Sequence, residues 1–66
     1  MKIIVNGDAR EVPATASLAG ALDHLGFGGA VVATALNGEF VASTARGAVT
    51  LCEGDRIEVL APMQGG

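Results

Sequence analysis

The last two residues, Gly65 and Gly66, are the part of the sequence best suited to chemistry. They follow Pro62, Met63 and Gln64, which come soon after a strand-like run at residues 56–60. Proline restricts the backbone, and glycine has no Cβ, so a terminal carboxylate here could enter a channel that excludes side chains. We therefore expect Gly66 to react, Gly65 to keep the end slender, and Pro62, Met63 and Gln64 to form a stalk. A frayed terminus without a role is the alternative.

The other residues with reactive side chains do not form a catalytic set. Cys52 is the single cysteine and is expected to be a small packing residue. His24 is expected on the surface, without a cysteine or second histidine beside it for metal binding. The acidic residues are spread along turns and strands without a close pair: Glu11, Glu39, Glu53, Asp55 and Glu58. No glycine-rich loop leads into Lys and Ser or Thr, so no phosphate cradle is expected. These patterns argue against an enzyme.

The composition limits the fold and the partners. A 66-residue chain is one small domain, and a domain of this size buries only about 60% of its unfolded surface. One cysteine excludes an internal disulfide, so the core must come from the apolar half of the residues. Seven acidic and four basic residues give a net charge of -3 without a basic cluster, which argues against nucleic acid. The charge would suit either docking on a basic surface or solubility.

The opening residues carry no targeting signal that we recognise. The apolar run at residues 3–5 is interrupted by Asn6-Gly7 and is too short for a signal sequence. No later segment approaches the length of a membrane span. We therefore expect no membrane partner and a cytoplasmic location, with which a reduced Cys52 is consistent.

The first half of the sequence predicts a hairpin followed by a helix. Residues 2–6 and 9–12 are expected as two strands joined at Asn6-Gly7, the dipeptide that favours a tight hairpin turn. Ser17 then resembles an N-cap, and Leu18, Ala21, Leu22 and Leu25 follow at helical spacing. Gly26 suits the left-handed position that ends a helix, whereas Gly20 weakens the helix by about 1 kcal/mol. The apolar stripe is expected to face a sheet.

The second half predicts three more strands. Residues 30–36 form a continuous apolar run, expected as a strand buried on both faces, and Asn37-Gly38 predicts a hairpin into residues 39–41. Residues 43–48 read as a polar crossing. In residues 56–60, Ile57 and Val59 should point to one face and the intervening residues to the other. The expected fold is α+β, with one mixed five-stranded sheet and a single helix across one face.

We expect the chain to divide into a domain at residues 1–60 and a flexible tail at residues 61–66. Six residues span at most about 20 Å when fully extended, which is enough to deliver the last atom into an enzyme pocket. Phe40, with Val41 and Leu60 if they face outward, could form an apolar docking patch. Packing of these residues in the core is the alternative.

Three segments followed by the terminal glycine pair carry a resemblance to a known family. They are residues 1–7, 32–39 and 53–59, which read MKIIVNG, VATALNGE and EGDRIEV. In this order the chain resembles, over its whole length, the ThiS family of ubiquitin-like β-grasp sulfur carriers of thiamine biosynthesis. It departs from many members at Val41-Ala42-Ser43, where they carry Val-Pro-Arg, and at Arg46, where tryptophan is common. These departures lie in the crossing and not in the tail.

The resemblance implies that this chain is a protein cosubstrate, not an enzyme, and that partner enzymes do the chemistry. An adenylyltransferase of the ubiquitin-activating type would use ATP and Mg to adenylate Gly66, and this chain itself would bind no cofactor or metal. Sulfur from a donor such as a cysteine desulfurase would then form a thiocarboxylate, which thiazole synthase would consume. Residues 62–65 would thread into the partner's active site.

Three other functions remain open at this point. A small subunit of molybdopterin synthase shares the fold and the Gly-Gly ending, although the short Asn6-Gly7 hairpin and the lack of a Phe-rich opening argue against it. A ubiquitin-like modifier would instead join Gly66 to a lysine of another protein. A plain interaction domain would have an inert tail.

Overall fold

The structure, a computed structural model, describes residues 1–61. Its elements are β1 (Lys2–Val5), β2 (Asp8–Glu11), α1 (Leu18–His24), β3 (Ala33–Leu36), β4 (Glu39–Val41), the 3-10 helix η1 (Ser43–Ala48) and β5 (Arg56–Leu60). Within residues 1–61 the five strands form one mixed sheet in the order β2-β1-β5-β3-β4. The β1 and β5 strands are parallel, and every other pair in this order is antiparallel. The expected α+β fold with one mixed five-stranded sheet is therefore confirmed.

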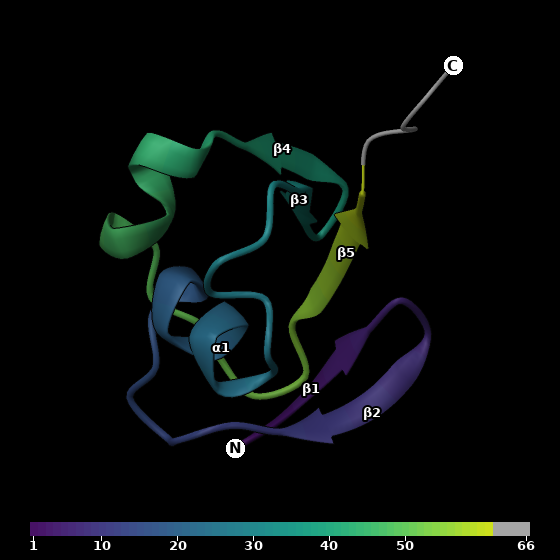
Figure 1. The fold of residues 1–66 in the computed structure, drawn as a ribbon. Helices are drawn as coiled ribbons and strands as arrows, with labels where there is room; N and C mark the ends of the chain where they lie inside the picture. The colour runs from purple at the N-terminus through teal and green to yellow at the C-terminus, as the bar shows by residue number, and fades with distance from the viewer. Residues whose placement is uncertain (62–66) are drawn as a thin grey trace.

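The core lies between α1 and one face of the sheet (Figure 1). Ile3 on β1, Ile57 on β5 and Leu18 on α1 are almost completely buried. They are joined by six further buried residues: Val5, Val12, Ala21, Leu22, Leu51 and Val59. Side chains alternate between the two faces of a strand, so the burial pattern of β5 places Ile57 and Val59 toward the core, as predicted. The face without the helix carries the other three residues of β5.

The two ends of α1 have the caps that the sequence predicted. The hydroxyl of Ser17 accepts a hydrogen bond from the backbone N–H of Gly20 at 3.0 Å. Gly26 follows the helix with a φ of +95°, a left-handed conformation that side chains with a Cβ rarely adopt. A helix of seven residues is too short to be stable alone, so its stability comes from packing on the sheet.

Both hairpins turn at an Asn-Gly pair. Asn6 and Asn37 have φ values of 50° and 51°, and Gly7 and Gly38 both have a φ of 87°. Positive φ at two successive positions is the requirement of the type I′ turn, whose twist matches that of the flanking strands. The sequence-based prediction of these two turns is confirmed.

Two predicted strands were wrong in detail. Residues 30–32 are not part of β3, and the strand is not buried on both faces, because α1 covers one face only. Val31, which lies before the strand, is 81% exposed. Residues 43–48, expected as a polar crossing, form the 3-10 helix η1. Val12 lies just beyond β2, although its side chain is buried in the core.

Two glycines near α1 should respond in opposite ways to alanine. A Cβ at Gly20 would meet only the Ser17 hydroxyl, at an ordinary contact distance of 3.4 Å. We expect Gly20→Ala to raise the free energy of unfolding by about 0.5–1 kcal/mol, since alanine favours the helix. Gly26→Ala should lower it by about 1–2 kcal/mol, since alanine is strained at positive φ. Urea unfolding of both variants checks this, and changes of the same sign would contradict it.

Candidate functional site

The end of β5 is the point from which the candidate reactive terminus leaves the domain. Leu60 is the last residue of β5, and Ala61, which is exposed, is the last described residue. Pro62, Met63, Gln64, Gly65 and Gly66 lie outside the described residues, so the predicted stalk and reacting residue are not placed. The structure does describe the base that positions them.

This base lies between two neighbouring strands. On one side, Ile4 and Val5 of β1 pair with Arg56 and Ile57. On the other side β3 pairs with a longer stretch of β5, ending with Ala33 opposite Leu60. Since β1 ends at Val5, its strand pairing stops before β5 does.

The side chain of Asn6 extends this pairing beyond the end of β1. The backbone N–H of Asn6 donates to the carbonyl of Ile57 at 2.9 Å. Its side-chain Oδ1 accepts from the N–H of Val59 at 2.8 Å, and its Nδ2 donates to the carbonyl of Val59 at 3.1 Å. The amide group thus offers the donor and acceptor that the next peptide group of β1 would have offered. From the sequence, Asn6 was expected only as a turn residue, and this contact was not predicted.

Asn37 makes a comparable contact at the start of β5. Its backbone N–H donates to the carbonyl of Arg56 at 2.8 Å, and its Oδ1 accepts from the N–H of Arg56 at 3.0 Å. Its Nδ2 donates to Asp55 Oδ1 at 3.2 Å. The side chains of both Asn-Gly turns therefore hold β5, at its beginning and near its end.

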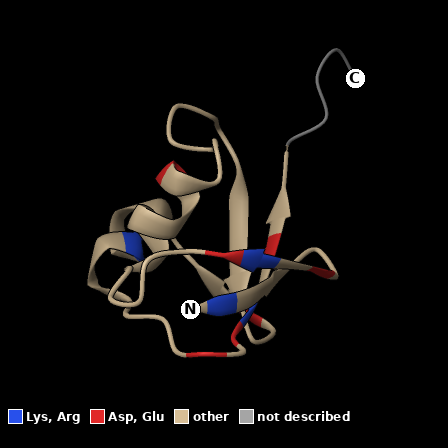
Figure 2. Ribbon diagram, turned by 90° about the horizontal axis from the view of Figure 1, so that it is seen from below, with Lys and Arg blue, Asp and Glu red and all other residues tan. Residues whose placement is uncertain are grey.

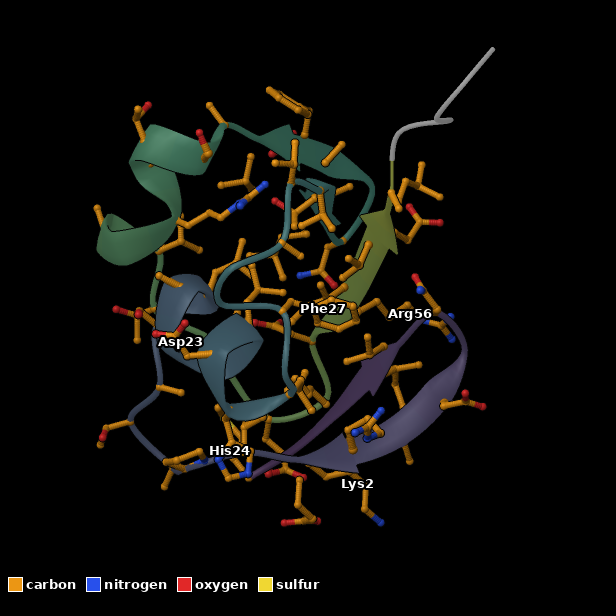
Figure 3. All side chains as sticks on the ribbon, viewed as in Figure 1. Lys2, Asp23, His24, Phe27 and Arg56 are labelled. Atoms are coloured by element: carbon orange, nitrogen blue, oxygen red, sulfur yellow. The ribbon has the colours of Figure 1, made fainter. Side chains whose placement is uncertain are left out.

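A groove of about 290 Å³ lies between the two Asn-Gly turns. Its lining comes from both turns, β1 and β5: Ile4, Asn6, Gly7, Asn37, Gly38, Arg56, Ile57 and Glu58. Arg56 projects from β5 near this groove (Figure 3). The amide groups of both asparagines already have partners in β5 or the turn before it, so they contribute little free hydrogen-bonding capacity to the groove.

The residues expected to form a docking patch do not all share one face. Phe40 pairs with Ala35, and Leu60 pairs with Ala33, so both lie on the face without the helix. They are 73% and 67% exposed. Val41 pairs with the buried Thr34 and packs against the core on the opposite face. The structure therefore brings Phe40 and Leu60 to one surface and separates Val41 from them.

Val31 is an exposed apolar residue that the sequence had predicted to be buried. It lies two positions before Ala33, the residue that pairs with Leu60 at the end of β5. The continuous apolar run had suggested a fully buried strand, whereas the absence of Leu, Ile and Phe from residues 30–35 was the available signal for weaker burial.

Arg46 links η1 to the strands beneath the patch. Its Nε donates to the hydroxyl oxygen of Thr34 at 2.9 Å, and its Nη2 donates to the carbonyl of Val32 at 2.6 Å. The hydroxyl of Thr34, a residue only 2% exposed, donates in turn to the carbonyl of Val41 at 3.0 Å. These bonds connect η1, β3 and β4, a role that the sequence did not reveal.

The residues set aside by sequence analysis do not form a second site. Cys52 is exposed, contrary to the expected packing role, because it lies in the turn before β5, where its N–H donates to Asp55 Oδ2 at 2.7 Å. His24 is exposed at the end of α1, as expected (Figure 3). Across residues 1–61, no three His, Cys, Asp or Glu side chains come together to hold a metal.

Charged residues of both signs are mixed on the described surface. Acidic and basic residues alternate along β2 (Figure 2). Lys2 on β1 lies opposite Glu11 in the strand register. Such an edge strand resists pairing with other chains. In the part of the chain that the structure describes, no helix has the length and apolar character needed to cross a membrane.

The Thr34 hydroxyl should contribute to stability through Arg46. We expect Thr34→Val to lower the free energy of unfolding by about 1–3 kcal/mol, because it removes a partner from a half-buried guanidinium and from a carbonyl. Combining it with Arg46→Met should cost less than the sum of the two single changes, by about 1 kcal/mol. Urea unfolding of the four proteins measures this coupling. Strict additivity would contradict the linkage.

Comparisons with known proteins agree with this fold. A family model described as the ThiS family matches residues 3–66. A crystal structure of the thiamine biosynthesis protein ThiS from Geobacter metallireducens is 33% identical, with a TM-score of 0.84, and the alignment covers 100% of both chains. An NMR solution structure of a thiamine biosynthesis protein from the same organism is 32% identical, with a TM-score of 0.78, covering 100% of this chain and 88% of that one. A comparison with curated protein sequences found no match.

The family match covers almost the whole chain, and the solved structures share both its fold and about a third of its residues. The terminal glycine pair lies within the matched range. The chain therefore belongs to the ThiS family.

Proposed function

We propose that this protein is a sulfur carrier of thiamine biosynthesis, with the C-terminal carboxylate of Gly66 as its reactive group. The observation that carries the proposal is the family match through residue 66, which includes the Gly65-Gly66 pair. Members of this family are generally non-catalytic sulfur carriers. The two similar structures are of thiamine biosynthesis proteins, which supports the same pathway here.

The terminal carboxylate must be activated before it can accept sulfur. Its negative charge repels nucleophiles, and oxide is a poor leaving group. A partner adenylyltransferase would therefore join the Gly66 carboxylate to the α-phosphate of ATP, with Mg, and release pyrophosphate. Sulfur from a persulfide donor then attacks the acyl carbon and AMP leaves. After a thiol has reduced the resulting acyl disulfide, sulfur remains on Gly66 as a thiocarboxylate.

The thiocarboxylate is a nucleophile that stays attached to a protein. Thiazole synthase would take the sulfur from Gly66 during ring formation. Carrying sulfur in this way avoids the release of free sulfide and presents the reactive atom in an oriented form. Gly65 and the stalk of Pro62, Met63 and Gln64 serve to bring that atom into the partner's active site.

The surface around Phe40 and Leu60 is our candidate for docking the adenylyltransferase. Both side chains are exposed on the face that α1 leaves uncovered, and Leu60 lies six residues before Gly66. A partner bound there would hold the base of the terminus close to its own catalytic centre. Large exposed apolar residues that lie on one face are typical of protein interaction surfaces.

Intact-protein mass spectrometry tests the carrier chemistry. After incubation with the cognate adenylyltransferase, ATP and a sulfur source, we expect a mass increase equal to replacing one oxygen by sulfur. Deleting Gly66 should abolish this increase. Because Cys52 is exposed and could itself take up sulfur, the experiment uses Cys52→Ser alongside the wild type. A persulfide on Cys52 would add a whole sulfur atom, so the two products differ in mass. No exchange by an active enzyme would contradict the proposal.

Substitution of Phe40 tests the docking surface. We expect Phe40→Ser to raise the Kd for the adenylyltransferase by about tenfold, because a large exposed side chain is lost from the contact. Stability should change little, since Phe40 is 73% exposed. The control is Ala9→Ser, which lies on the same face of the sheet but on the edge strand β2. Equal Kd values for the two variants, measured by calorimetry, would rule this surface out.

A further inference from the structure

We propose that Asn6 is a positioning residue for the reactive terminus. Its side-chain amide fixes the end of β5 and thereby the place and direction from which residues 60–66 reach the adenylyltransferase. This inference rests on the proposed function of Gly66 as the adenylated residue. It concerns a residue far from the terminus in sequence, 53 positions before Val59.

The contact between Asn6 and Val59 fills a gap in the sheet. On the β1 side of β5, the carbonyls of Asp55 and Ile57 accept hydrogen bonds from the backbone N–H groups of Ile4 and Asn6. Val59 is next in this alternation, but β1 has already turned away at Asn6-Gly7. The side chain of Asn6 reaches both polar groups of Val59 in its place.

An amide is suited to this position for a chemical reason. It offers one acceptor to the N–H of Val59 and one donor to its carbonyl, so only one of its two orientations satisfies both groups. A carboxylate of the same shape would place an oxygen against the Val59 carbonyl. A residue without the side chain would leave both groups of Val59 to solvent on this side.

The position of this contact along β5 links it to the terminus. Val59 lies seven residues before Gly66, so the reacting carbon can be at most about 25 Å from it. Each residue of β5 that loses its strand pairing would lengthen the unpaired segment before Gly66. A longer unpaired segment allows the carboxylate a larger volume and lowers its effective concentration at the partner's ATP. Asn6 limits this volume on one side of β5, and the pairing of Leu60 with Ala33 limits it on the other.

Asn37 provides a matched comparison within the same protein. It occupies an equivalent Asn-Gly turn, with a φ of 51° against 50° for Asn6, and also bonds to β5 through its side chain. Its contact is at Arg56, however, ten residues before Gly66. Loss of the Asn37 side chain should therefore weaken the fold without releasing the end of β5.

The experiment compares Asn6→Gly with Asn37→Gly. Glycine adopts positive φ without strain, so each variant keeps its turn and loses only the side-chain amide. Steady-state kinetics of AMP formation by the adenylyltransferase, with sulfur donor present, gives kcat and KM. We expect Asn6→Gly to lower kcat at least about fivefold with KM nearly unchanged, because the docking surface remains while the carboxylate is misplaced. Asn37→Gly should leave kcat within about twofold of the wild type.

Amide hydrogen exchange gives a readout that does not depend on activity. The N–H of Val59 should exchange faster in Asn6→Gly than in Asn37→Gly when the two variants are compared at equal global stability. If Asn6→Gly does not fold, Asn6→Asp takes its place, since it keeps the acceptor for Val59 but opposes its carbonyl. The same loss of kcat is then expected.

Two results would overturn the inference. One is an equal effect of the two glycine variants on kcat, and the other is an unchanged kcat in Asn6→Gly. These differ from failure of the proposed function, in which the wild type itself would not be adenylated by an active enzyme. That result would remove the role of Asn6 in presentation along with the carrier chemistry.

Discussion

The last strand of the chain holds the sheet together. β1 and β2 form one hairpin, β3 and β4 form another, and in the strand order these two hairpins are joined only through β5. Pairing on both sides of β5 therefore connects residues from opposite ends of the sequence, such as Val5 and Ile57. The sheet is incomplete until residues 56–60 have joined it, and contacts of such long sequence separation tend to slow folding. The same strand leads to the proposed reactive terminus, so a stretch of backbone that is paired on both sides lies close to the proposed working end.

The helix α1 covers one face of the sheet (Figure 1), and the two faces therefore have different uses. The covered face contains Ile3, Ile57 and Val59 and supplies the apolar core on which a domain of this size depends. The uncovered face carries Phe40 and Leu60, whose side chains are mostly exposed and so contribute little to the stability of the isolated chain. Arg46 holds η1 to Thr34 and Val32 through charged hydrogen bonds, whereas the family resemblance marked it only as a departure from tryptophan.

Much of the fold could be predicted because its signals are local. The Asn-Gly turns, the Ser17 cap, the left-handed Gly26 and the alternation in β5 each follow from the conformational preferences of a few neighbouring residues. Two of the predictions that were wrong depended on what lies across the sheet. Whether Val31 is buried, or whether Val41 shares a face with Phe40, is decided by the position of the helix and by strand register. The contacts of Asn6 with Val59 and of Arg46 with Thr34 were not visible for the same reason, since the partners lie 53 and 12 positions apart. The proposed reacting residues came from composition and family resemblance, and the described residues do not test them.

Every strand pairing within residues 1–61 is made by residues up to Leu60. Proteolytic trimming within the last five residues would therefore remove the proposed sulfur-accepting group and leave these pairings in place. Such a clipped chain would remain folded and would retain Phe40 and Leu60. If these residues form the docking surface, the clipped chain would bind the activating enzyme without reacting. In a cell that contains both forms, the clipped chain would act as a competitive inhibitor of the intact one.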